Sequence, residues 1–88
     1  MTKIVVPSVW AKDGQTEFDG IHGSLPEVIK RFAADNPELR RRVLGPDGEP
    51  VSYINICIGD RIVPRDQRAT TVVEAGSVVT IISPMAGG

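Results

Sequence analysis

The chain has 88 residues, enough for one domain with a small core, because a chain of this size buries only about 60–65% of its unfolded surface. Its net charge of −1 at pH 7 disfavours a nucleic-acid partner, since domains that bind nucleic acid carry clustered positive charge. Its one cysteine, Cys57, excludes an internal disulfide and a cysteine-rich metal or iron–sulfur site, and it fits a reducing compartment.

No apolar stretch approaches the 18 or so residues that a membrane span needs, and residues 1–7 lack the pattern of a signal peptide. We therefore expect a cytoplasmic protein without a membrane partner.

The N-terminal residues predict a hairpin. Residues 3–9 are rich in β-branched side chains and predict a strand, in which Pro7 indicates an edge position or a bulge. Asp13-Gly14 is a turn signal, and residues 16–21 predict the second strand.

A helix is expected next. Ser24 is the predicted N-cap, with Glu27 three residues later in the pattern of a capping box. Asn36-Pro37 ends this helix, because the residue before proline is pushed out of the α region. Residues 38–44 predict a short second helix. The apolar residues of the main helix recur at helical spacing: Leu25, Val28, Ile29, Phe32 and Ala33.

The second half of the chain predicts three strands, over residues 53–58, 61–63 and 77–83, with a polar, irregular segment over residues 64–71. On the last strand we assign Val79 and Ile81 to the core. Thr80 and Ile82 then lie on the opposite face of the sheet, and Asn55 and Cys57 are expected beside them.

Together these elements predict an α+β fold, a mixed sheet covered on one face by one main helix. We expect residues 1–83 to form the domain and residues 84–88 to form a flexible tail. The tail ends in Gly87-Gly88, which chance alone gives roughly 0.5% of the time at average glycine usage. Without side chains on its last two residues, such a terminus fits a tunnel too narrow for other residues.

The order of these elements resembles the ubiquitin-like sulfur carriers, which have the β-grasp fold and include the small subunit of molybdopterin synthase and the thiamine-pathway carrier. Three segments carry the resemblance: the isoleucine-rich strand at residues 53–58, Ala75-Gly76-Ser77-Val78-Val79, and the tail from Ser83 to Gly88. Val6-Pro7-Ser8-Val9 and the loop at residues 45–51 resemble the CysO-type, cysteine-pathway branch.

The resemblance implies that the chemistry takes place at the carboxylate of Gly88. An E1-like activating enzyme would convert it with ATP to an acyl-adenylate, and a sulfur donor would replace AMP to leave a thiocarboxylate. Gly87 would give access, together with Ala86 and Met85, and the small side chain of Ala86 would keep the tail slender. The chain would then be a protein co-substrate and not an enzyme, with no bound cofactor or metal, and its partner would consume the ATP.

Partner docking is assigned to residues near that tail: Ile82, Thr80, Asn55, Pro84 and Met85. An apolar site beside the reacting end is where a partner must grip. The alternative is that Ile82 is merely a tolerated exposed side chain, since much of any protein surface is apolar.

The resemblance favours sulfur delivery to cysteine, through attack on an aminoacrylate of a PLP-dependent synthase and release by a metal-dependent peptidase. Delivery to molybdopterin, thiamine or a secondary metabolite is a near alternative. Two other classes remain open: a ubiquitin-like modifier conjugated to lysines, and a β-grasp interaction module with an incidental tail.

The remaining candidate residues predict packing or solvent exposure. Cys57 and Trp10 are expected to pack, although Trp10 is also a candidate binding anchor. His22 is the one histidine of the sequence, and a lone histidine does not indicate a metal or catalytic site. Asp60, Asp66 and Glu74 are expected to be solvated.

Overall fold

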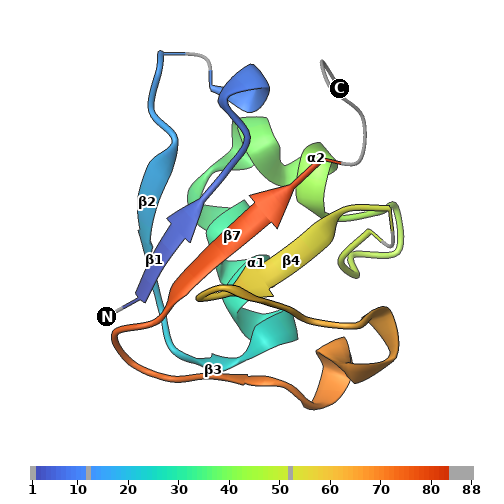
Figure 1. Cartoon of the computed structure of the whole chain (residues 1–88). Helices are drawn as coiled ribbons and strands as arrows, with labels where there is room; N and C mark the ends of the chain where they lie inside the picture. Colours follow the sequence, from blue (N-terminus) through green and yellow to red (C-terminus); the bar gives the residue numbers. More distant parts are fainter. Residues whose placement is uncertain (1, 12, 52, 84–88) are drawn as a thin grey trace.

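The computed structural model describes residues 2–11, 13–51 and 53–83. The main sheet forms one layer, and the helices pack against it as a second layer (Figure 1). The elements in chain order are β1 (Thr2–Val5), the 3-10 helix η1 (Ser8–Trp10), β2 (Glu17–Gly20), β3 (Gly23–Ser24), α1 (Leu25–Asp35), η2 (Pro37–Leu39), α2 (Arg40–Val43), β4 (Asn55–Ile58), β5 (Arg61–Ile62), η3 (Arg65–Thr70), β6 (Val72–Val73) and β7 (Val78–Ile82).

The main sheet has five strands in the order β2-β1-β7-β4-β5. The pair β1–β7 is parallel, and the other neighbours are antiparallel, so the predicted mixed sheet and the N-terminal hairpin are confirmed. In Figure 1, β7 runs between β1 and β4.

The expected edge position or bulge at Pro7 is wrong. The strand before it, β1, lies between β2 and β7 and ends at Val5. Pro7 follows the strand and precedes η1, where its missing N–H interrupts no ladder. Its carbonyl accepts a hydrogen bond from the backbone N–H of Trp10 at 3.0 Å, which closes the turn of η1.

The main helix begins and ends as its sequence signals predict. The Oγ of Ser24 accepts a hydrogen bond from the backbone N–H of Glu27 at 3.3 Å. Asn36 is the C-cap, and its backbone N–H donates to the Phe32 carbonyl at 3.0 Å. All five residues of the predicted apolar stripe are buried.

The core lies between α1 and one face of the sheet. Ile4 and Ile56 come from the sheet, and Val79 and Ile81 join them from β7, as predicted. The rings of Phe18 and Phe32 meet edge to face, with centroids 5.2 Å apart, an arrangement that favours aromatic pairs beyond their buried area.

The expected short helix at residues 38–44 is present as two pieces, η2 and α2. Its apolar residues point inward: Leu39, Val43 and Leu44 are all buried.

Two expectations for the second half need correction. The segment at residues 64–71 is not irregular, because six of its residues form η3. A second, two-stranded sheet, in which β3 pairs with β6, was not expected from the sequence. Both strands are only two residues long, too short for a period-2 pattern to show in the sequence.

Arg68, on η3, is a charged residue whose side chain is buried. Its guanidinium donates to the Val51 carbonyl at 3.1 Å and to the Ile54 carbonyl, so it ties η3 to the segment that leads into β4. Burial lowers the pKa of Arg68, and nearby Arg65 lowers it further. Within the described residues its buried Nε–H has no hydrogen-bond partner.

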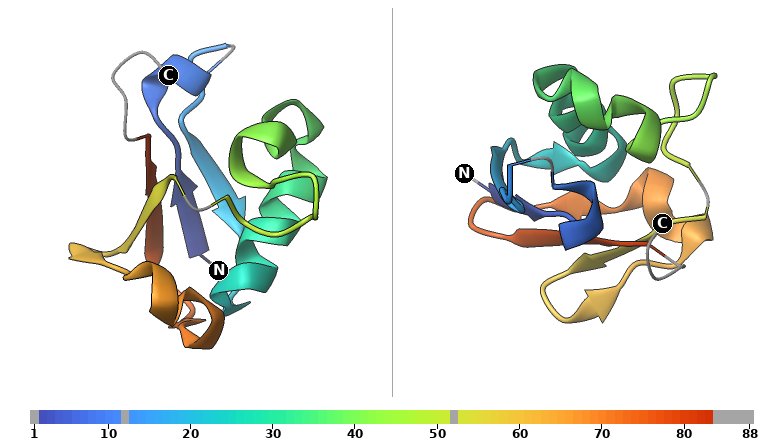
Figure 2. Two further views of the ribbon diagram at one scale, coloured as in Figure 1. Left: turned by 90° about the vertical axis from the view of Figure 1, so that its right-hand side faces the viewer. Right: turned by 90° about the horizontal axis from the view of Figure 1, so that it is seen from above.

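The helices α1 and α2 both lie on one side of the main sheet, and the opposite face is uncovered (Figure 2). A mixed sheet that wraps one main helix in this way is the β-grasp fold, which confirms the predicted fold class. Among the described residues, none of the helices is both long and apolar enough to cross a membrane.

Candidate functional site

The candidate site is the uncovered face of the sheet, together with the end of β7 from which the tail continues. Ser83 follows β7 directly and is the last residue that the structure describes. The five predicted tail residues lie outside the described part: Pro84, Met85, Ala86, Gly87 and Gly88.

The strand register places the predicted docking residues on that face. Asn55 pairs with Ile82, and Cys57 pairs with Thr80, across the antiparallel β4–β7 ladder. Because paired residues share a face, these four side chains lie opposite the buried Ile81, as predicted. Ile82 is 42% exposed, while Asn55 and Thr80 are half-buried.

The apolar surface extends beyond the residues predicted from the sequence. Val78, 40% exposed, is on the same face of β7, and Ile62, 65% exposed, pairs with Cys57 across the β4–β5 ladder. The alternation of side chains along β7 could have predicted that Val78 lies on the open face. The position of Ile62 could not be predicted in this way, because it depends on how β5 pairs with β4. We call this surface the open-face patch. It consists of the exposed Ile62, Val78 and Ile82, together with Thr80 of β7 and Cys57 of β4, which lie among them.

Cys57 is buried, as predicted, although it is not part of the core cluster on the helix side. Its partner across the β4–β5 ladder, Ile62, projects from the same face. The thiol therefore belongs to the floor of the open-face patch.

The other half of the open face is charged. Lys3 pairs with Asp19 in the β1–β2 register and forms an ion pair with Glu17 at 3.1 Å. Both side chains of this ion pair are at least half exposed, so it contributes little to stability. The face is thus apolar over β4, β5 and β7, and polar over β1 and β2.

A groove opens at the end of β7. It has a volume of about 560 Å³, and we call it the tail-root groove. Its lining comes from η1, the η2–α2 region, the segment before β4 and the end of β7: Trp10, Pro37, Glu38, Arg41, Arg42, Tyr53 and Ser83. Trp10 is 6% exposed and belongs to the core cluster, so the packing role predicted for it is confirmed.

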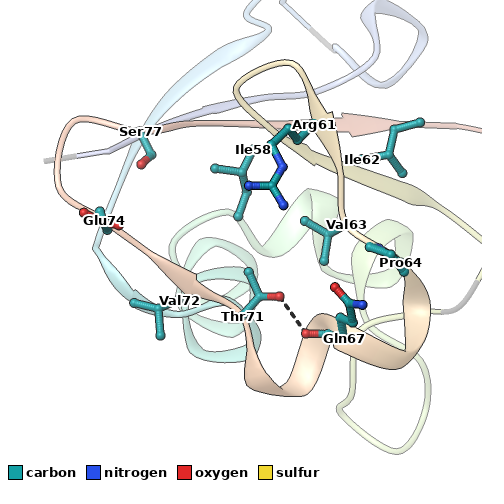
Figure 3. A pocket seen from close by; sticks show the side chains of 10 residues that line it. All are labelled: Ile58, Arg61, Ile62, Val63, Pro64, Gln67, Thr71, Val72, Glu74 and Ser77. Carbon is teal, nitrogen blue, oxygen red and sulfur yellow. Dashed lines mark hydrogen bonds between the residues drawn. The ribbon is translucent and has the colours of Figure 1, made fainter.

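A smaller cavity of about 210 Å³ lies at the other end of β7, between β5, η3 and β6 (Figure 3). Ser77 lines it, six residues before Ser83 and so about 20 Å along the strand from the tail root. On the side of the cavity formed by η3, the hydroxyl of Thr71 donates a hydrogen bond to the Gln67 carbonyl at 2.6 Å. This cavity is therefore far from the tail root and from any chemistry at the tail.

Within residues 2–11, 13–51 and 53–83, no three histidine, cysteine or acidic side chains cluster closely enough to hold a metal ion. His22 is exposed, and Asp60, Asp66 and Glu74 are exposed as predicted. The described residues thus offer a surface for contact at the open face and at the tail root.

The β-grasp fold, with one open sheet face and with β7 as its last strand, places the chain in the class of ubiquitin-like proteins. Residues 11–88 match the ThiS family. The chain therefore belongs to this family and is a ubiquitin-like sulfur carrier, a class of small protein sulfur donors. No curated protein matches the sequence significantly.

Solved structures with the same fold include three of similar size. The BexX/CysO complex of Amycolatopsis orientalis contains a chain that superposes with a TM-score of 0.80 at 18% identity, covering 100% of both chains. CysO of Mycobacterium tuberculosis gives 0.79 at 21% identity, covering 97% of this chain and 100% of the other. SAMP1 of Haloferax volcanii gives 0.76 at 21% identity, covering 99% and 98%. At these identities the likeness is one of fold.

Proposed function

We propose that the chain carries sulfur as a thiocarboxylate on its C-terminal Gly88. An E1-like enzyme would join the Gly88 carboxylate to the AMP portion of ATP, with release of pyrophosphate. A sulfur donor would then form a C–S bond at the same carbon as the C–O bond to AMP breaks. The observation that carries this proposal is the family match, which runs through the Gly87-Gly88 end.

The activation step is needed because a carboxylate is a poor electrophile. The reference pKa of a C-terminal carboxyl group is about 3.3–3.7, so it is ionised at neutral pH. Conversion to a mixed anhydride with AMP supplies a leaving group. The thiocarboxylate that results is a nucleophile at the end of the chain.

The tail and the domain take different roles in this proposal. Residues 84–88 enter the partner's active site, where the absence of side chains at Gly87 and Gly88 allows close backbone approach. Ala86 keeps the tail slender, and Pro84 and Met85 contribute to partner docking. Residues 1–83 form the domain that the partner holds.

The open-face patch is the proposed gripping surface for the activating enzyme. Its three exposed aliphatic side chains are bordered by the charged surface of β1 and β2, and an apolar area with a polar edge is typical of protein interfaces. Ile82 lies one residue before Ser83, so a partner that receives the tail passes directly over it.

Cysteine formation is the favoured destination of the sulfur, supported by the fold shared with CysO structures. The thiocarboxylate would add to an aminoacrylate bound by a PLP-dependent synthase, and a metal-dependent peptidase would release the product. Molybdopterin, thiamine and secondary metabolites are the alternative destinations. In each case the chain is a cytoplasmic co-substrate, without a bound cofactor, and catalysis belongs to its partners.

Intact mass spectrometry tests the proposal. The protein is co-expressed with its activating enzyme and a sulfur donor, and we expect a mass gain equal to one oxygen-to-sulfur exchange, located at Gly88 by fragmentation. A chain that lacks Gly87 and Gly88 is the control and should gain nothing. An unmodified Gly88 under these conditions would contradict the proposal.

The variant Gly87→Val tests the role of the tail separately. We expect it to melt at the wild-type temperature and to lose activation, because a β-branched side chain cannot follow glycine into a narrow tunnel. Normal activation of this variant would refute the tunnel argument.

The fold shared with SAMP1, a small archaeal modifier protein, favours one second candidate: conjugation of Gly88 to lysine side chains through an isopeptide bond. Conjugates that survive a reducing gel and contain a Gly-Gly-modified lysine would support it. Function that persists after deletion of Gly87-Gly88 would instead indicate an interaction module.

A further inference from the structure

We propose that the tail-root groove binds an acidic segment of the protein that receives the tail. The groove is separate from the open-face patch, and Arg41, Arg42 and Tyr53 line it beside Ser83. This inference rests on the proposed function, because that function requires a partner that takes in residues 84–88. It adds a second docking surface of defined chemistry, a cationic and aromatic one.

The charge of the groove differs from that of the rest of the chain. The 88 residues carry ten basic and eleven acidic side chains, and three of the ten are the consecutive Arg40, Arg41 and Arg42. The arginine run is therefore a local positive region on a chain that is otherwise acidic. Such a region attracts a negative segment of a partner and orients its approach.

The two arginines of the groove are available for that contact. In the described part of the chain, Lys3, Lys30 and Arg31 each form an ion pair, with Glu17, Glu49 and Asp35 respectively. Within that same part, Arg41 and Arg42 form none, and both are exposed.

Trp10 holds one of these arginines in place. The guanidinium carbon of Arg42 lies 5.8 Å from the centroid of the Trp10 ring, within the range of a cation–π contact. Because Trp10 itself is buried in the core cluster, this contact anchors Arg42 to a rigid base. A guanidinium that already rests against a ring loses less freedom when it binds a carboxylate through two parallel hydrogen bonds.

The types of residue in the groove are those that dominate binding energies at protein interfaces. Tryptophan, tyrosine and arginine are the residues most enriched among interface hot spots. Tyr53 is 55% exposed although it immediately precedes the buried Ile54, so its ring and hydroxyl group are presented to solvent. This exposed aromatic side chain has no role in the core.

The length of the tail brings a partner to the groove. Five residues follow Ser83, and five fully extended residues span at most about 17 Å. A protein that reaches the Gly88 carboxyl group therefore has its tunnel mouth within this distance of Ser83, which lines the groove. We therefore assign the contact of Arg41 and Arg42 to aspartate or glutamate side chains on the surface around that mouth.

Glu38 also lines the groove and bears the opposite charge. Its carboxylate reduces the attraction for an acidic segment, so its removal should strengthen binding where removal of the arginines weakens it. Effects of opposite sign from one groove distinguish a docking contact from a loss of folding.

The test measures affinity between the full-length chain and its activating enzyme by calorimetric titration. We expect Arg41→Glu and Arg42→Glu, tested as separate single variants, each to weaken binding on the order of tenfold, as the loss of a close charge pair at an interface does. Glu38→Gln should tighten it. Arg40→Glu is the matched control, since it reverses the same charge at an exposed member of the same run that does not line the groove, and we expect less than about a twofold change because it makes no direct contact there.

Equal weakening by Arg40→Glu and by the groove variants would overturn the proposal, because net charge would then explain the result. Unchanged affinity in the Arg41 and Arg42 variants would overturn it as well. If the free protein showed nuclear Overhauser contacts between residues 84–88 and the side chains of Arg41 or Tyr53, the groove would hold the chain's own tail, and the proposal of a partner segment would fail. Thermal melts of all variants exclude unfolding as the cause.

The same samples separate this inference from the proposed function. If the thiocarboxylate forms normally and groove variants bind normally, the sulfur-carrier function stands and the groove proposal fails. If wild-type protein neither binds the activating enzyme nor gains sulfur, both fail.

Discussion

The two faces of β7 differ in what covers them. Val79 and Ile81 are at most 1% exposed and pack beneath α1, whereas Val78 and Ile82, their neighbours in sequence, are 40% and 42% exposed on the open face. All four are branched aliphatic residues of similar hydrophobicity. Their surroundings, and not their chemistry, therefore decide which of them stabilise the fold and which remain free for a partner.

Stability and partner binding can therefore be altered separately on one strand. Replacing a residue on the covered face removes contacts within the folded chain. Replacing its neighbour on the open face mostly removes surface that water already reaches.

Ile81→Ala is expected to lower the free energy of unfolding by about 2–5 kcal/mol, since it removes buried methyl and methylene groups and leaves a cavity. Chemical denaturation followed by circular dichroism measures this loss. A loss below about 1 kcal/mol would show that the covered face of β7 is loosely packed. Ile82→Ala, the neighbouring change on the open face, is the matched control.

Arg68→Met is expected to lower the free energy of unfolding by about 1–3 kcal/mol, because the buried carbonyls of Val51 and Ile54 lose their donor. Methionine retains the apolar stem, so the loss reports mainly on hydrogen bonds. Arg61→Met, on the exposed β5, is the control and should change stability little. Hydrogen exchange should also rise at residues 51–54 in the Arg68 variant, and unchanged exchange there would contradict its clamping role.

Ser24→Ala is expected to cost about 1 kcal/mol, since the variant loses the acceptor for the Glu27 N–H at the start of α1. The same denaturation experiment measures it. Ser24→Asp restores an acceptor and should recover most of the loss, and a variant that remains as unstable as Ser24→Ala would argue against the capping role.

Local patterns in the sequence predicted the elements that form the covered face. The helix from Ser24 to Asn36 has a cap, a stripe and a stop signal, and each is found where the sequence places it. The alternation of side chains along β7 was enough to assign Ile81 to the core and Ile82 to the opposite face. These predictions succeeded because period, capping and termination act within a few residues.

The features that the sequence did not predict depend on residues far apart in the chain. Pro7 indicated an edge strand, but β1 lies inside the sheet because the distant β7 pairs with it. The buried position of Arg68 depends on carbonyls 14 and 17 residues earlier in the chain. The extension of the open-face patch to Ile62 likewise requires the β4–β5 register.

Ile82→Ala has the smallest expected effect on stability and the most informative effect on binding. Since the side chain is 42% exposed, we expect the free energy of unfolding to fall by less than about 1 kcal/mol. If the open-face patch grips the activating enzyme, affinity should fall on the order of tenfold, as for a residue near the centre of an interface. Val72→Ala, an exposed aliphatic change on β6 outside both the patch and the tail-root groove, should leave affinity unchanged. Full affinity in Ile82→Ala would place the grip elsewhere, and the contrast between the two faces of β7 would then concern stability alone.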